Sequence, residues 1–275
     1  MMAWQKYVLV FRLQSPLHIG YRKVGNLMQT RGYVPGKILW AALTARLTRD
    51  FDDGADARRY VDIGKDVKAS FRFGYLYPAL PKNPLQRVQS ANDLAIHYPW
   101  EDNFDYLFLH SYASTALDYT SQSAEDAMLH ETEFIAPYTR TGQPVYLTGD
   151  LFVNTDLPTP LDKWQDVLHK LQLGAERGYG WGRVQLVSCD KQGAPFTNEP
   201  RAGTHNDRIT AHLKVKNASN VQGPIEVLIG WERNNDPDQR GEWKLGKEPI
   251  ICYAPGAMIT EEGNFQIVEN GLWEA

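Results

Sequence analysis

A glycine-rich segment over residues 174–182 has the clearest potential for chemistry in this sequence. It reads Gly-Ala-Glu-Arg-Gly-Tyr-Gly-Trp-Gly, contains Arg177 and is followed directly by Arg183. Glycines let a backbone approach a ligand closely, and successive N–H groups can form an anion-binding nest. The arginines would add positive charge for a phosphate, and Tyr179 and Trp181 could stack on bases. The pattern suits nucleic-acid binding, but it also suits a tight helix–strand connection whose aromatic side chains pack in the core.

A second basic segment covers residues 18–34, which carry three positive charges and no acid. It leads into Pro35, and proline suits the first position of a helix, where unpaired N–H groups attract anions. Lys37 lies in that first turn, where a cation is normally unfavourable, so a bound phosphate would explain it. A solvated basic loop is the alternative. His18 has the chemistry of a general acid or base for RNA cleavage, although a lone histidine is more often structural.

Several other kinds of site are excluded by spacing. No Gly-Lys-Ser/Thr follows the glycines, and the segment runs from helix to strand, opposite to a dinucleotide fingerprint. The seven histidines show neither His-x-x-x-His nor His-Glu-x-x-His, and no Gly-x-Ser-x-Gly is present. Residues 15–49 contain no Asp or Glu to hold a metal beside the basic segment. We therefore expect no metal and no cofactor.

Composition and charge limit the classes of protein to which this chain can belong. The chain has 275 residues, of which 43% are hydrophobic and 23% charged, as in a globular protein with a sizeable core. Its formal net charge is −4, yet the first 50 residues hold eight Lys or Arg and one Asp, which points to a localised anionic ligand. Two cysteines, Cys189 and Cys252, cannot form a disulfide framework. With no long apolar run and no signal-peptide pattern at the N-terminus, we expect a cytoplasmic protein without a membrane span.

The elements that would position these segments indicate an α+β fold. An apolar stripe predicts a helix over 35–49, whereas residues 50–70 show few apolar positions at either period. A second helix is predicted over 160–173, with Thr159 as its N-cap in a capping-box-like start. Thr141-Gly-Gln-Pro144 is typical of a hairpin turn between two strands. Strands are expected over residues 4–13, 71–77, 106–112, 129–135, 145–153 and 183–189.

The last third of the sequence differs in composition. A polar break over 190–208 suggests a domain boundary, and a polar loop covers 234–242. The tail shows no clear helix. Its strand-like runs are residues 209–215, 225–231, 249–254 and 264–268.

Three segments, in the same order, resemble the CRISPR-associated RAMP (repeat-associated mysterious protein) superfamily. Ser15-Pro-Leu-His-Ile-Gly20, followed by Arg31-Gly-Tyr-Val-Pro-Gly-Lys-Ile-Leu39, is similar to the superfamily's opening strand, loop and helix start. Thr115–Thr120 and Leu129–Ile135 resemble its central β-hairpin region, and Gly174–Val184 resembles its Gly-rich loop. The match covers about residues 4–189. Lys37 departs from the small residue that usually follows the Pro-Gly entry.

The resemblance implies a ferredoxin-like (RRM-like) domain over residues 1–189, with a central β-hairpin insertion, and a β-rich extension over 190–275. It also implies a type III effector-complex subunit that binds crRNA and contacts other effector subunits. Backbone subunits of such complexes carry a catalytic Asp after the first strand, and the corresponding residues here include none, so we expect no target-RNA cleavage. The residues expected to contact RNA are His18, Arg22, Lys23, Arg31, Lys37, Gly174, Arg177, Gly178, Tyr179, Gly180, Trp181, Gly182 and Arg183.

Two alternative functions remain open at the level of sequence. One is a metal-independent endoribonuclease that processes CRISPR-repeat RNA, with His18 as general acid or base and Lys23 or Arg22 stabilising the developing phosphorane charge. The other is a structural subunit that makes only protein contacts. The main hypothesis is a non-catalytic crRNA-binding subunit whose affinity depends on salt.

Overall fold

The first strand of the fold is β1 (Trp4–Leu13), as the sequence predicts. In the computed structural model, which describes residues 3–54, 56–126, 128–216, 218, 220–233, 242–246, 248–261 and 263–275, β1 lies inside a six-stranded sheet. It pairs antiparallel with β11 (Tyr146–Asn154) on one side and β12 (Val184–Phe196) on the other. β11 also pairs with the outer strands β4 (Phe71–Phe73) and β5 (Tyr77–Pro81), and β5 pairs with β6 (Leu94–Ile96), which follows the 3₁₀ turn η1 (Ala91–Asp93).

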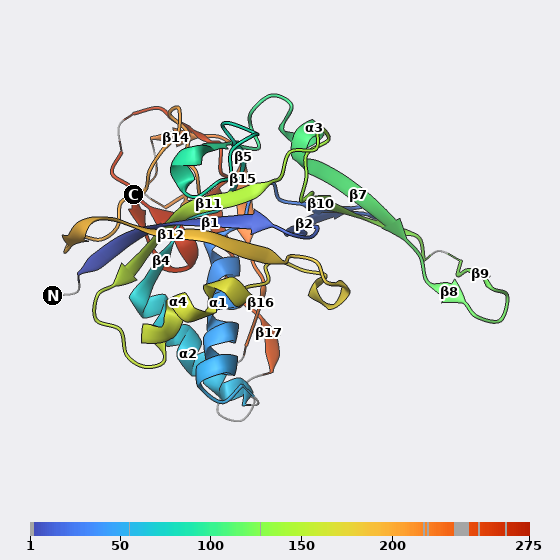
Figure 1. The fold of residues 1–275 in the computed structure, drawn as a ribbon, viewed down its shortest axis with the longest axis horizontal. Coiled ribbons are helices and arrows are strands. Elements are labelled where there is room, and N and C mark those ends of the chain that lie inside the picture. Colours follow the sequence, from blue (N-terminus) through green and yellow to red (C-terminus); the bar gives the residue numbers. More distant parts are fainter. Residues whose placement is uncertain are drawn as a thin grey trace.

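Helices cover one face of this sheet (Figure 1). Alternation along β1 points Leu9 and Phe11 toward the helices, where Leu43 and Leu47 of α1 bury their side chains. Val10 points to the opposite face, into a smaller apolar cluster with residues such as Val88. The helical segments are α1 (Gly36–Phe51), α2 (Ala57–Ser70), and the consecutive turns η2 (Leu161–Lys163), α4 (Trp164–Val167) and η3 (Leu168–Lys170).

Two helical predictions need correction. Residues 57–70 form α2, which the sequence did not indicate because its apolar stripe is reduced to few positions, with Ile63 and Val67 buried. The predicted helix 160–173 has the expected buried face, but it is a 3₁₀–α–3₁₀ succession that ends at Lys170. Its start has no side-chain cap hydrogen bond, so the capping-box prediction at Thr159 is wrong. The helix predicted over 35–49 is confirmed as α1.

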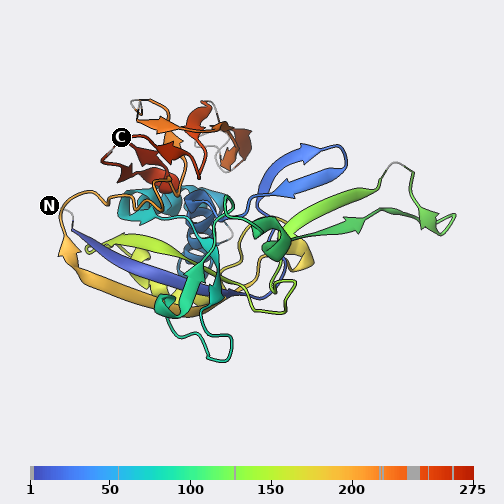
Figure 2. The ribbon, with the colours of Figure 1, turned by 90° about the horizontal axis from the view of Figure 1, so that it is seen from above.

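A second sheet, in the order β2-β3-β10-β7, extends from the body as two adjacent hairpins (Figure 2). The basic segment 18–34 was predicted to be a loop, but it folds into the antiparallel hairpin of β2 (Gly20–Val24) and β3 (Leu27–Thr30). The predicted strand 106–112 begins instead with α3 (Phe104–Phe108). The second hairpin consists of β7 (Leu109–Ser114) and β10 (His130–Ile135), with the short pair β8 (Leu117–Asp118) and β9 (Ser123–Ala124) toward its tip.

The turn over 141–144 is present, but the strands on either side do not pair with each other. Gly142 donates its N–H to Thr139 O at 2.9 Å, which closes the turn. β10 then pairs with β7 and β3, whereas β11 enters the main sheet beside β1. The sequence could not show this, because each flanking strand has a suitable partner far away in the chain.

The C-terminal part is rich in short strands, as expected. β12 continues to Phe196, past the predicted boundary at residue 189, because it is an edge strand whose polar outer residues face solvent. Residues 234–241 of the predicted polar loop lie outside the described residues. The strands here are β13 (Leu213–Lys214), β14 (Val221–Gln222), β15 (Ile225–Leu228), β16 (Trp231–Arg233), β17 (Trp243–Leu245), β18 (Ile250–Tyr253), β19 (Met258–Ile259), β20 (Gln266–Ile267) and β21 (Trp273–Glu274), with the 3₁₀ turn η5 (Glu269–Gly271) before the last.

The fold is therefore α+β. None of the helices in the described ranges is long and apolar enough to cross a membrane.

Candidate nucleic-acid interface

The Gly-rich segment forms a loop, with the 3₁₀ turn η4 (Arg177–Tyr179), between the helical turns and β12. Gly174 and Gly182 have φ of +75° and +74°, which disfavours other residues. A Cβ on Gly182 would lie 1.8 Å from Leu173 O, and one on Gly174 would lie 2.4 Å from His18 O. These two glycines are therefore required by close backbone approach. Gly178 and Gly180 have no atom near their Cβ position and leave the loop surface open.

The loop packs directly against the segment that connects β1 to β2. Gly182 donates its N–H to Pro16 O at 2.7 Å, and Ala175 donates to His18 O at 2.9 Å. Arg183 donates its backbone N–H to Ser15 Oγ at 2.9 Å. The structure thus brings together two segments that the sequence analysis singled out separately, and it joins them mainly through backbone groups.

His18 holds this joint to the β7–β10 hairpin. Its side chain is 6% exposed, and its Nδ1 lies 2.7 Å from Glu133 O. A carbonyl oxygen can only accept, so Nδ1 carries the proton and donates. The ring therefore positions the loop and the hairpin relative to each other instead of facing solvent.

Four of the cations predicted to contact RNA are exposed. Arg177 and Arg183 are exposed on the Gly-rich loop and at its end, and Arg22 and Lys23 are exposed on β2. Arg22 donates from Nε to Gln29 Oε1 at 2.6 Å, which leaves its outer nitrogens on the surface. Lys37 is in the first turn of α1, as predicted, and lines a different cavity near α2.

Arg31 is placed differently from the other predicted RNA contacts. Its guanidinium forms a salt bridge of 2.7 Å with Glu226 and donates to the Tyr33 hydroxyl at 2.8 Å, with its side chain only 13% exposed. Burial alone would raise the pKa of Glu226, but the hydrogen bonds from His212 and Arg31, with the charge of Arg31, lower it to about 2. Arg31 therefore belongs to an internal ionic network.

His212 completes this network. Its Nε2 lies 3.1 Å from Glu226 Oε2, and its Nδ1 lies 2.7 Å from the Tyr75 hydroxyl. Burial, and then the charge of Arg31, lower the pKa of His212 despite its contact with Glu226. A neutral ring that donates to Glu226 and accepts from Tyr75 fits both contacts. Sequence analysis missed this network because its members are far apart in the chain and form no local motif.

A cavity of about 550 Å³ separates the Gly-rich loop from the β7–β10 hairpin. Tyr179 lines it and is 84% exposed, and Trp181 packs its ring edge-on against Phe134 at 5.0 Å between centroids. Of the two aromatic residues in the loop, Tyr179 is thus open to a ligand and Trp181 anchors the loop. The hairpin contributes residues that sequence analysis missed, although β alternation could have placed them on one face: Tyr112, Ser114, His130 and Thr132.

The described residues contain no group of three His, Cys, Asp or Glu side chains arranged to hold a metal ion. The predicted anion-binding nest is not formed by most of the loop, because Ala175, Tyr179, Gly180, Trp181 and Gly182 already donate their N–H groups to backbone carbonyls. What the site offers is a set of exposed guanidinium groups and an exposed tyrosine ring. Such a set binds phosphates and stacks on bases.

Comparison with known proteins gives structural likenesses only. No protein-family model and no curated protein matches the sequence. One similar solved chain comes from the type III-B Cmr-beta complex bound to cognate target RNA and AMPPnP, with 10% identity, a TM-score of 0.48, and 92% of this chain and 85% of that chain covered. A chain of the same complex bound to cognate target RNA is 10% identical with a TM-score of 0.47, and the match covers 92% of this chain and 86% of that chain. A chain of the apo state is 10% identical with a TM-score of 0.40, and the match covers 66% of this chain and 96% of that chain.

Proposed function

We propose that this chain is a non-catalytic crRNA-binding subunit of a type III CRISPR ribonucleoprotein effector complex. The observation that carries the proposal is the joint between the Gly-rich loop and the β1–β2 connection. Because backbone groups make this joint, the side chains of Arg177, Arg183 and Tyr179 remain exposed, and Tyr179 also lines the cavity beside the β7–β10 hairpin. Phosphate contacts from the arginines would set affinity, and stacking on Tyr179 would hold a base without reading its identity.

The proposal includes a ferredoxin-like RAMP domain. The main sheet has the strand order β12-β1-β11, and both β4 and β5 pair with the free side of β11. All four of these pairings are antiparallel. With α1 and α2 between β1 and β4, and α4 between β11 and β12, this is the succession β-α-β-β-α-β with the last strand beside the first. The β7–β10 hairpin would be the central insertion, and the strands after β12 would form the extension.

Two observations favour a non-catalytic role. The His18 ring is buried and hydrogen-bonded to a backbone carbonyl, so it lacks the access that a general acid or base needs. The basic segment also offers no carboxylate, since residues 15–49 contain no Asp or Glu. A cytoplasmic location stays a prediction from the sequence.

Contacts with other effector subunits would use the C-terminal extension. Val227 on β15 and Ile251 on β18 lie opposite each other in the pairing, and Ile225 lies two residues along the same face. All three side chains are more than half exposed. β15 is an edge strand of its sheet, and an exposed apolar edge of this kind is typical of a protein contact.

A gel assay with labelled CRISPR-repeat RNA in EDTA tests the proposal. We expect the purified chain to shift the RNA intact, with weaker binding at higher salt. Arg177→Ala should weaken binding by about tenfold, whereas Arg58→Ala, an exposed arginine at the start of α2, is the matched control and should change it little. A discrete shorter product, lost in His18→Ala, would replace the proposal with an endoribonuclease. Binding that is the same in Arg177→Ala and insensitive to salt would replace it with a structural subunit.

A further inference from the structure

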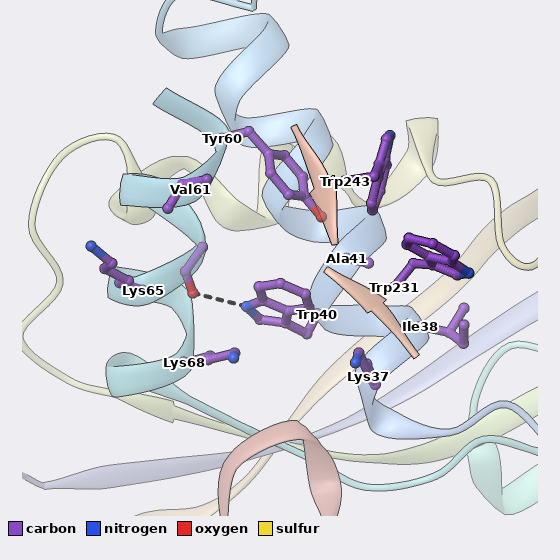
Figure 3. Close-up of a pocket in the computed structure, with 11 residues that line it drawn as sticks. Lys37, Ile38, Trp40, Ala41, Tyr60, Val61, Lys65, Lys68, Trp231 and Trp243 are labelled. Carbon is purple, nitrogen blue, oxygen red and sulfur yellow. Dashed lines mark hydrogen bonds between the residues drawn. The ribbon is translucent and has the colours of Figure 1, made fainter. Parts of the chain in front are cut away.

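A tryptophan-lined cavity lies between α1, α2 and the β16–β17 hairpin (Figure 3). Its volume is about 250 Å³. Trp40 lines it and donates from Nε1 to Gly64 O at 2.9 Å, so the orientation of this indole is fixed. A Cβ on Gly64 would lie 2.9 Å from the Trp40 ring, so glycine makes the room for it.

The β16–β17 hairpin presents two more indoles to this cavity. Trp231 pairs directly with Leu245, and Trp243 lies two residues before Leu245 on the same strand. The two tryptophans therefore share one face of the hairpin as diagonal neighbours. Trp231 is 65% exposed and Trp243 is also more than half exposed. Two mostly exposed tryptophans that line one cavity together with a third indicate a binding surface more than a filled core.

Lysines supply the polar part of the cavity. Lys65 and Lys68 line it from α2 and Lys37 lines it from α1, and none of the lining residues within the described ranges is an Asp or Glu. The Lys68 ammonium lies 4.9 Å from the centre of the Trp40 ring, and Lys65 lies 4.0 Å from Asp62, which does not line the cavity. The positive charge of the two α2 lysines, Lys65 and Lys68, disfavours a cationic guest in this aromatic cavity and favours an anionic one.

We propose that this cavity binds one nucleotide, with its base against the indoles and its phosphate on the lysines. A planar base suits flat aromatic walls, and every base has a face that can stack. The volume fits one base in preference to a peptide helix. Lys68 and Trp231 also line a neighbouring cavity of about 670 Å³, whose lining includes one carboxylate, that of Glu248, and which would receive the phosphate side at its Lys68 end. This inference goes beyond the proposed function, since it depends neither on the Gly-rich loop nor on crRNA. The nucleotide is either a free mononucleotide or an unpaired nucleotide of an RNA strand.

Quenching of tryptophan fluorescence in the purified full chain tests this site, with AMP, adenosine and a ten-nucleotide oligoadenylate as probes. We expect AMP to bind, adenosine to bind several-fold more weakly, and Trp231→Leu to weaken AMP binding at least tenfold. Lys65→Gln should weaken it about threefold. Lys163→Gln is the control, since Lys163 is similarly exposed on η2 outside the cavity and should leave binding unchanged.

The remaining outcomes distinguish a free mononucleotide from an RNA strand as the ligand, and a nucleotide from an acidic peptide. Quenching by the oligonucleotide but not by AMP, lost in Trp231→Leu and retained in Arg177→Ala, supports the site and identifies an RNA strand as its source. Equal AMP binding in the parent chain and Trp231→Leu overturns the proposal. So does the absence of quenching by both nucleotide probes, whether or not an acidic hexapeptide with one Phe binds instead. Because Trp231→Leu and Lys65→Gln leave Arg177 intact, failure of the cavity proposal is distinguishable from failure of the proposed function.

Discussion

Two joints connect distant segments of this chain, and they use their charged residues in opposite ways. The joint between the Gly-rich loop and the β1–β2 connection consists of backbone hydrogen bonds and close approach at Gly174 and Gly182. The joint between the body and the C-terminal extension also has close backbone approach, at Gly36 and Gly271, but its charged contacts are made by side chains: Arg31 pairs with Glu226, which also contacts His212. The first joint leaves its arginines free to face a ligand, whereas the second uses its arginine for structure. A basic residue in a motif therefore acquires its role from how its segment is held in place.

The largest effect is expected at the backbone joint. Gly182→Ala would place a methyl group 1.8 Å from Leu173 O at a φ of +74°, so backbone strain and overpacking add. We expect a loss of about 4 kcal/mol in the free energy of unfolding, measured by urea denaturation. Gly178→Ala is the control, because no atom lies within 4 Å of its Cβ position, and it should change stability by less than about 0.5 kcal/mol. Equal losses in the two variants would contradict the role assigned to Gly182.

The ionic joint should be the next most sensitive. Glu226→Gln keeps the shape of the side chain but leaves the Arg31 charge, whose side chain is 13% exposed, without its counter-ion. We expect a loss of about 3 kcal/mol in unfolding free energy at pH 7. Asp150→Asn breaks the more exposed pair with Lys6 and should cost at most about 1 kcal/mol, which makes it a matched comparison. If both variants lose the same amount, burial does not distinguish the two pairs.

The same joint should depend on pH. The pKa of Glu226 is lowered to about 2 in the folded protein, so its contribution to stability is complete above its unfolded pKa near 4.5 and declines as the pH falls toward 2. The pKa of His212 is also lowered in the folded protein, so the unfolded chain takes up this proton first and the fold loses further stability as the pH falls below about 6.5. We expect the stability difference between the parent chain and Glu226→Gln to shrink by about 2 kcal/mol between pH 5 and pH 2.5. A difference that stays constant over this range would mean that the carboxylate does not carry the joint.

A smaller effect, confined to binding, is expected at Tyr179. Its ring is 84% exposed, so Tyr179→Ala removes a stacking surface without opening the core. We expect RNA affinity to fall by about tenfold, by fluorescence anisotropy, with the unfolding free energy unchanged. Tyr119→Ala, an even more exposed tyrosine near the tip of the β7–β10 hairpin, is the control. A loss of stability in Tyr179→Ala would place this ring in the structure of the loop instead.

Sequence reasoning succeeded for elements whose structure is determined by a local pattern of residues. The alternation of β1 and the apolar stripe of α1 are local patterns, and both elements were placed within two residues of their bounds. It failed for elements whose structure depends on packing or pairing with a segment far away in the chain. α2 has too few apolar residues to reveal itself and is stabilised by packing on α1, and the basic segment 18–34 becomes a hairpin because β3 finds β10 as its neighbour.

The candidate site shows the same division. The Gly-rich loop was recognised from composition, and the structure adds that two of its four candidate glycines are required by backbone approach. The burial of His18 and Arg31 could not be predicted, because Glu133, Glu226 and His212 come from segments more than a hundred residues away. Which cations face solvent is a property of the assembled fold.

The salt dependence of RNA binding tests the central claim most directly. Binding of labelled CRISPR-repeat RNA would be measured at several salt concentrations for the parent chain and for the variant carrying Arg177→Gln and Arg183→Gln. If these arginines contact phosphates, the slope of log K against log salt should decrease in magnitude by about 1.4, since each phosphate contact on a single strand contributes about 0.7. An unchanged slope, with the variant folded as stably as the parent, would contradict the assignment of the Gly-rich loop as the RNA-binding surface.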